Sequence, residues 1–301
     1  MNLLKAEIFL YAVDCGSLSR TAEVFGYTPS GISHMMSSFE NEIGFPLLQR
    51  SKTGVIPTPN AKRIIPMLRT IIGHAEQFRQ TVCEINGLAC GSLRIAAYSS
   101  IASQWLPEVL GIYHKLYPQI RLNLFEGVWQ EVEAYMQEHR ADVGLYSFRK
   151  GITHNWIPLR EDPMIVAVPL DHPLAKQAEV RLEELKGESI IMPAYGEDLD
   201  VLDLLQRSNI QIPFTFHTLE NYSAMGMVEE GLGIMIANEL ITKGRTNRFK
   251  ILPIYPEASI TLGIAVSPES MQAPAVKHFI EICVKTLRED KFRRDKEAVF
   301  E

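Results

Sequence analysis

Several features are scarce in this 301-residue chain, and each scarcity excludes a class of protein. The four cysteines, Cys15, Cys83, Cys90 and Cys283, form no C-x-x-C pair, so a structural zinc site is disfavoured and reduced thiols are expected. No apolar run approaches the roughly 18 residues that a membrane span requires. The N-terminus has no basic segment followed by an apolar core and a small-residue cleavage site. We therefore expect a cytoplasmic protein without a membrane partner.

Catalytic motifs are equally scarce. The chain contains no H-E-x-x-H, G-x-S-x-G, P-loop or full G-x-G-x-x-G motif. The nearest fragment, residues 231–233, precedes a predicted strand, whereas a dinucleotide-binding turn follows one. We expect no enzyme activity, no cofactor and no metal. A metabolic enzyme or a small-molecule receptor without DNA binding remains the alternative.

What the chain does contain is typical of a folded protein of about two domains, with 46% hydrophobic and 22% charged residues. The formal net charge is −6, but it is unevenly distributed. Residues 1–70 carry seven Lys or Arg against five Asp or Glu, which makes this segment +2 and the remainder −8. The asymmetry has the sign that DNA binding requires, although it is weak.

The stretch from Ser17 to Gly44 is predicted to form two short helices joined by a tight turn. Gly16 can end a preceding helix in a left-handed conformation, while Ser17 caps the next one. Thr28 followed by Pro29 is an N-cap with proline at the first helical position. Apolar residues at helical spacing bury one side of this second helix and leave short polar groups outside: Ser30, Ser33, His34 and Ser37. This pattern is typical of a helix-turn-helix DNA reader.

Helix pairs are also common packing units in all-α proteins, so whether this pair binds DNA must be decided from the flanking segments. A helix over residues 3–15 can pack behind the pair. Beyond Gly44, two short extended pieces near 47–50 and 55–57 surround a Ser-Lys-Thr-Gly turn, which indicates a β-wing. Its cations Arg50 and Lys52 would meet phosphates at a wing tip, or would simply be solvated surface charges.

A long helix is predicted from Thr58-Pro59 to about residue 86, although Pro66 should bend it near its start. Packing of this helix against its own domain would bury its apolar stripe, but no second long helix lies nearby in the sequence. We therefore predict a homodimer. The stripe is a heptad seam with alternating spacings of four and three: Ile64, Leu68, Ile71, Ala75, Phe78, Val82 and Ile85.

From Gly91 strands and helices alternate, which predicts a mostly parallel α/β domain ending in a solvated tail after Arg288. Its roughly 200 residues fit two lobes, with crossings near 160–164 and 267–270 and a ligand crevice at the strand ends. We divide the chain into a DNA-binding domain (1–58), a linker helix (59–89) and an effector domain (90–301). Lobe I covers about 91–162 and 268–301, and lobe II about 163–267.

These features together resemble the LysR-type transcriptional regulators over nearly the whole chain. Residues 9–58, FLYAVDCGSLSRTAEVFGYTPSGISHMMSSFENEIGFPLLQRSKTGVIPT, match the family's helix-turn-helix and wing almost without gaps. GSLRIA (91–96), DHPLA (171–175) and GLGIMIA (231–237) match recurring effector-domain patterns. The resemblance implies an all-α winged helix-turn-helix, a dimerising linker helix and an α/β effector domain of two lobes like periplasmic solute-binding proteins. It also implies a homotetramer that responds to a small metabolite.

The resemblance also implies roles for individual residues. DNA contacts are expected at Thr28, Pro29, Ser30, Ser33, His34, Ser37, Arg50 and Lys52, with Ser33 the leading candidate for the groove. The family commonly has arginine at the position of His34 and arginine or lysine at that of Ser37, so the electrostatic part of binding should be weaker here. This chain also has Ala61 where the family commonly has glycine, and Asn238 where the family commonly has proline.

Effector contacts are expected after the first strand of the effector domain, at Ser99, Ser100 and Ile101. Free N–H groups at a helix start would suit an anion there, although Ser-Ser is equally readable as a cap. Weaker candidates are Tyr146, Tyr195, Thr218 and Asn221. The expected function is a ligand-responsive bacterial regulator, and the expected partners are double-stranded DNA at an interrupted inverted repeat, a small-molecule effector such as an organic anion, further copies of the chain, and RNA polymerase.

Overall fold

A computed structural model describes residues 1–51, 54–243 and 248–297, with side chains up to residue 288 and excluding that of residue 51. Lys52, a predicted wing contact, lies outside the described residues. The chain forms two compact units, which are described separately. The first comprises Met1–Gly91 with Gln137–Arg140, and the second comprises the rest.

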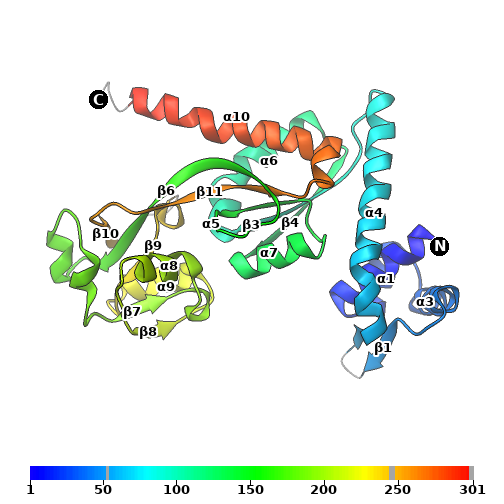
Figure 1. Ribbon diagram of the computed structural model, residues 1–301, viewed down its shortest axis with the longest axis horizontal. Helices are drawn as coiled ribbons and strands as arrows, with labels where there is room; N and C mark the ends of the chain where they lie inside the picture. The colour runs from blue at the N-terminus through cyan, green and yellow to red at the C-terminus, as the bar shows by residue number, and fades with distance from the viewer. Residues whose placement is uncertain (52–53, 244–247, 298–301) are drawn as a thin grey trace. The chain divides into compact units, whose positions relative to one another are not determined.

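The first unit is the predicted winged helix-turn-helix followed by one long helix (Figure 1). Its caps are those expected, since Ser17, Thr28 and Thr58 each accept a hydrogen bond from the backbone N–H three residues later. The two wing strands pair antiparallel. The elements are α1 (Leu3–Cys15), α2 (Leu18–Phe25), α3 (Pro29–Ile43), β1 (Leu48–Ser51), β2 (Gly54–Pro57) and α4 (Pro59–Ile85).

We call α1, α2, α3 and the two wing strands the head of this unit. The core of the head also includes the start of α4. Phe9, Ile32 and Phe39 are fully buried, and Leu68 of α4 packs against the same cluster with 4% of its surface exposed. The helix runs unbroken through Pro66, where the Thr70 hydroxyl donates to the Pro66 carbonyl at 3.0 Å. The first turns of α4 are therefore part of the head.

The expectation of four reduced cysteines is wrong for one pair, because Cys83 and Cys90 form a disulfide. Their Cα atoms are 6.0 Å apart, although no C-x-x-C motif links them. The turn that ends α4 explains the pairing. Gly87 adopts a left-handed φ of 72°, and the Leu88 N–H donates to the Cys83 carbonyl at 2.9 Å, which folds the chain back on itself. Cys15 and Cys283 are free.

The second unit is an α/β structure of two lobes. Lobe I contains β3 (Gly91–Tyr98), α5 (Ser99–Gln104), α6 (Leu106–Leu116), β4 (Ile120–Gly127), α7 (Trp129–Gln137), β5 (Val143–Ser147), η5 (Ser270–Gln272) and α10 (Pro274–Glu297). Lobe II contains η1 (Pro173–Lys176), η2 (Leu182–Leu185), β7 (Ile190–Met192), η3 (Ala194–Gly196), α8 (Leu199–Arg207), β8 (Phe214–His217), α9 (Asn221–Glu229), β9 (Met235–Asn238), η4 (Glu239–Thr242) and β10 (Phe249–Pro253).

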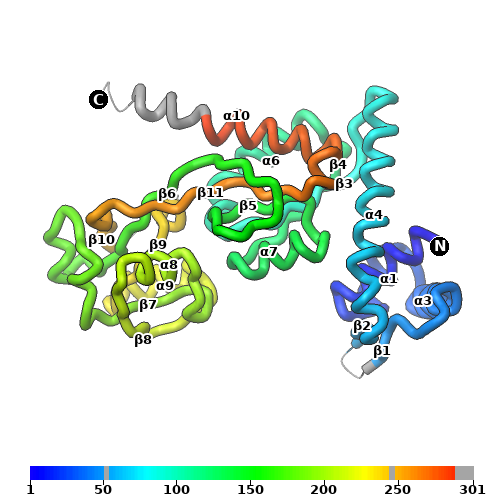
Figure 2. Tube along the Cα trace, in the orientation of Figure 1, coloured from blue at the N-terminus to red at the C-terminus, as the bar shows by residue number. Residues whose placement is uncertain are grey.

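Two long strands, β6 (Asn155–Pro169) and β11 (Ser259–Val266), run side by side and link the lobes (Figures 1 and 2). They pair antiparallel, and β6 also pairs antiparallel with β9 and β10. Parallel pairing occurs between β3 and β5 and between β7 and β8. The sheet is therefore mixed, and the prediction of a mostly parallel sheet is wrong because the two segments that link the lobes are themselves antiparallel strands. The first includes the predicted crossing at 160–164, whereas the second is β11 and not the predicted 267–270.

The last helix extends beyond its predicted end. The residues after Arg288, predicted to be a solvated tail, continue α10 as far as Glu297. Upstream, α10 packs through Phe279 and Cys283, both fully buried, and Tyr113 of α6 donates a hydrogen bond to the Ala275 carbonyl at 3.0 Å. None of the described helices is both long and apolar enough to span a membrane.

Candidate functional site

The exposed start of α3 presents the polar face predicted for DNA reading. Thr28, Pro29, Ser30, His34 and Ser37 are exposed, and Ser33 is half-buried. Ile32, Met36 and Phe39 occupy the opposite side of the helix and are buried. The structure thus brings the recognition-helix candidates together on one surface.

Ser33 contacts the wing directly. The Arg50 guanidinium donates a hydrogen bond from Nη2 to the Ser33 hydroxyl oxygen at 2.6 Å, although 17 residues separate them. The sequence predicts that Ser33 reaches the DNA groove and that Arg50 reaches a phosphate. The contact makes them a single polar unit, which sequence spacing alone does not reveal.

Three further cations of the head were passed over by the sequence reasoning. Arg20, Lys62 and Arg63 are exposed, and none forms an ion pair with a described carboxylate. By contrast, Arg69 is 7% exposed and pairs with Asp14 at 2.6 Å. The predicted surplus of positive charge therefore lies at the surface, where phosphate contact is possible.

The predicted heptad seam on α4 divides into two parts. Ile64 and Leu68 pack into the head core. Further along, Ile71 and Val82 are each 40% exposed, Phe78 is 70% exposed and Ile85 is 79% exposed. Only this second part presents an apolar surface that a partner helix can cover.

In the second unit a cavity of about 310 Å³ lies between the lobes. Its walls come from the starts of four helices, α5 and α7 of lobe I and α8 and α9 of lobe II. Of the predicted effector residues, Ser99, Ser100 and Asn221 line this cavity. The volume is at the lower end of the usual range for ligand pockets, roughly 300–1,000 Å³.

The other predicted effector residues do not line the cavity. Ile101 and Tyr146 are fully buried in lobe I. The Tyr146 hydroxyl donates to Glu133 at 2.6 Å, and burial raises the pKa of Tyr146 well above its usual value. Tyr195 of η3 is 69% exposed, and its backbone N–H donates to the carbonyl of Thr218, the residue after β8, at 2.8 Å.

None of the six acidic residues at the cavity is among the predicted effector residues: Glu126, Glu131, Glu197, Asp198, Asp200 and Glu220. Asp198 caps α8 by accepting the Asp200 and Val201 N–H groups at 3.0 and 3.2 Å. Burial, with a smaller contribution from neighbouring Asp200, raises the pKa of Asp198 to about 6. Asp200 in turn accepts hydrogen bonds from Tyr98, Ser147 and Arg149, so lobe I and lobe II residues meet at one wall.

Two family models together match almost the entire chain. "Bacterial regulatory helix-turn-helix protein, lysR family" matches residues 3–62, and "LysR substrate binding domain" matches residues 86–288. The chain belongs to the LysR family. It is a DNA-binding transcriptional regulator with an effector-binding domain, and not an enzyme.

Known LysR-type proteins are similar to this chain over their full length. The uncharacterised regulator YvbU of Bacillus subtilis is 24% identical over 94% of this chain and 97% of its own. A full-length OxyR variant from Pseudomonas aeruginosa has a TM-score of 0.73 at 21% identity, covering 94% of this chain and 98% of its own. The effector-binding domain of QuiR, solved with shikimate, has a TM-score of 0.60 at 20% identity, covering 67% of this chain and 99% of its own.

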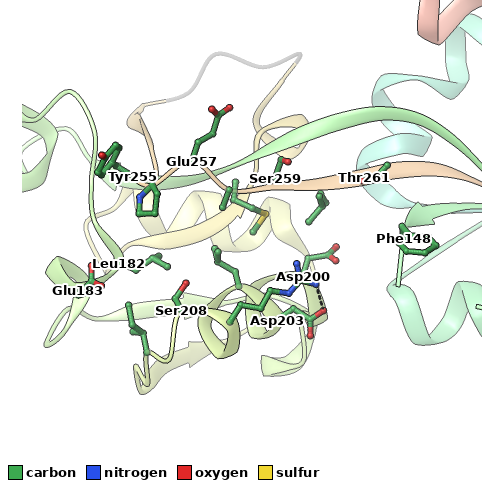
Figure 3. Close-up of a pocket in the computed structure, with 17 residues that line it drawn as sticks. Phe148, Leu182, Glu183, Asp200, Asp203, Ser208, Tyr255, Glu257, Ser259 and Thr261 are labelled. Carbon is green, nitrogen blue, oxygen red and sulfur yellow. Dashed lines mark ion pairs between the residues drawn. The ribbon is translucent and has the colours of Figure 1, made fainter. Parts of the chain in front are cut away.

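This LysR-type regulator has a second, larger cavity of about 610 Å³, which shares Asp200 with the first. Figure 3 shows Asp200 and Asp203 on one wall, facing the segment that carries Ser259 and Thr261. Arg149 pairs with both aspartates, at 2.8 and 2.6 Å, and Arg207 pairs with Asp203 at 3.5 Å. The charges of this wall are largely neutralised within the protein, unlike those of the smaller cavity.

Proposed function

We propose that this LysR-type regulator binds double-stranded DNA as a dimer, assembled further into a tetramer, at an interrupted inverted repeat. The observation that carries the proposal is the exposed apolar seam on α4 from Ile71 to Ile85, which continues directly from a head with an exposed recognition helix. An apolar stripe at heptad spacing is satisfied by the same stripe of a second copy. Two heads held by such a pair reach successive major grooves, roughly 34 Å apart.

The effector is proposed to bind in the cavity between the lobes. Support comes from the convergence of the two lobes there, since a ligand that contacts both can favour one lobe arrangement over another. The QuiR domain solved with shikimate supports a small organic molecule as effector in a domain of this fold. RNA polymerase is the proposed downstream partner of the DNA-bound form.

Selection of binding sequences from a random DNA pool by the full-length protein tests the proposal. We expect enriched sequences with two inverted half-sites whose centres are about one helical turn, or a multiple of it, apart. The control pool carries one half-site with scrambled flanks. Equal affinity for single and paired half-sites would contradict dimeric recognition.

The Ser33–Arg50 contact predicts that the two residues act as one unit on DNA. Ser33→Ala should lower affinity for the selected operator about tenfold, and Arg50→Ala should reduce the slope of log affinity against log salt by about one. The double variant should lose less than the sum of the two single losses, because each single change already disrupts the shared contact. Strictly additive losses, measured by fluorescence anisotropy over a salt series, would show that Ser33 and Arg50 contact DNA independently.

A further inference from the structure

The cavity between the lobes carries a strong negative charge. Six of the residues that line it are carboxylates, and none of its described lining residues is Lys, Arg or His. The nearby cation Arg149 is already paired with Asp200 and Asp203. A recess lined by charges of one sign concentrates its field inward, so it attracts cations and repels anions.

The six carboxylates differ in the hydrogen bonds and ion pairs that they already form within the protein. Asp200 is paired with Arg149, Asp198 accepts two backbone N–H groups, and Glu131 accepts the Val128 N–H at 3.1 Å. Glu126, Glu197 and Glu220 have no hydrogen-bond or ion-pair partner for their carboxylates among the described residues. They come from three different segments around the opening, and their charge is available to a ligand.

Uncharged polar groups of the same cavity also lack partners. Ser100 is 9% exposed, and its hydroxyl has no hydrogen-bond partner in the described part of the chain. The side-chain oxygens of Gln130 and Asn221 are buried without a donor, and the indole N–H of Trp129, which lines the same cavity, is buried without an acceptor. Buried polar groups are normally hydrogen-bonded, so the Gln130 and Asn221 oxygens point to a bound molecule that supplies N–H donors, and the Trp129 indole points to an acceptor on the same molecule.

The occupant of this cavity must be larger than a metal ion. No three His, Cys, Asp or Glu side chains among the described residues are grouped closely enough to hold a metal. The acidic groups are instead distributed around about 310 Å³, a space that suits a small organic molecule. An extended organic cation can meet several of these carboxylates at once.

We infer that the effector of this regulator is a small organic cation carrying one or more ammonium groups. This inference rests on the proposed function of the cavity and names the class of ligand that the cavity takes. It replaces the organic anion expected from the free N–H groups near Ser99 and Ser100. Of the four helix starts at the cavity, that of α8 is already capped by Asp198 and the N–H just before α7 is occupied by the Glu131 carboxylate, whereas those of α5 and α9 have no side-chain cap.

Matched probes of opposite charge test the inference on the full-length protein without DNA. We would measure thermal shift and calorimetric binding for α,ω-diamines of three to six carbons, with the dicarboxylates and diols of the same lengths. At least one diamine should raise the unfolding temperature saturably, whereas the dicarboxylates and diols should not. Stabilisation by a dicarboxylate and by no diamine, or by no probe at all, would overturn the inference.

Site variants separate binding in the cavity from general charge attraction. Combining Glu126→Gln, Glu197→Gln and Glu220→Gln should weaken diamine binding by about tenfold or more, since each exposed carboxylate contributes modestly. The control is Glu179→Gln, an exposed position that does not line the cavity, and it should bind as the unmodified protein does. Equal affinity of the triple variant would overturn the inference. Because no DNA is used, failure here leaves the operator selection untouched, and failure of that selection leaves this result standing.

Discussion

A full-length protein carrying Phe78→Glu and Ile85→Glu is expected to be monomeric and to bind its operator at least about a hundredfold more weakly. Both side chains are more than two-thirds exposed on α4 and lie on the 4-3 seam. Glutamate at these positions places four carboxylates in the apolar contact of a dimer, and burying an unpaired charge there is strongly unfavourable. Loss of the second head removes an avidity gain of roughly 10²–10⁴.

The matched control for this pair is Gln77→Glu with Thr81→Glu. It adds two carboxylates to the same stretch of α4 but away from the seam residues. This control should remain dimeric by light scattering and should keep most of its operator affinity. A seam variant that stays dimeric at micromolar concentration would show that α4 is not the dimer contact.

The seam also shows where sequence periodicity stops being informative. The same spacing of four and three continues from Ile64 to Ile85, yet Leu68 is buried in the head whereas Ile85 is 79% exposed. A helix face packs against its own domain or against a partner with one and the same period. Which seam residues remain available to a partner helix depends on the folded head, whose core extends to the first turns of α4.

Local signals predicted the head well because they act over a few residues. Ser17, Thr28 and Thr58 cap the helices that they were expected to cap. The disulfide and the antiparallel β6–β11 pairing were not predictable in this way. They depend on which distant segments the fold brings together, and no short motif encodes that.

The effector cavity illustrates the same limit at a site. Strand-end reasoning selected Ser99 and Ser100, which do line the cavity, and also Tyr146, which turns into the lobe I core and bonds to Glu133. The acidic lining comes from three chain segments, and its individual members look ordinary in sequence. Asp198, for example, has the appearance of a helix cap and also acts as one. Its contribution to the charge of the cavity appears only when the lobes are assembled.

The second large effect is expected at the ion pair that fixes α4 to α1. Arg69 donates two hydrogen bonds to Asp14, at 3.1 and 2.6 Å, and has no other partner among the described residues. Asp14→Ala therefore leaves a buried guanidinium without a carboxylate. We expect the local stability of the head to fall by about 2–4 kcal/mol, slightly below the cost at a fully buried pair because the Asp14 side chain is 30% exposed.

A second ion pair between the same two helices supplies the control. Arg79 and Glu7 are 3.3 Å apart with side chains 55% and 27% exposed, so Glu7→Ala should cost less than about 1 kcal/mol. Hydrogen exchange of the α1 and α4 amides in the full-length protein would measure both changes. Replacing Asp14 and Arg69 together by leucine should recover most of the loss, because an apolar pair needs no counter-charge. Equal costs for Asp14→Ala and Glu7→Ala would mean that burial of Arg69 does not set the strength of the α1–α4 contact, and that the apolar core of the head alone holds the linker helix.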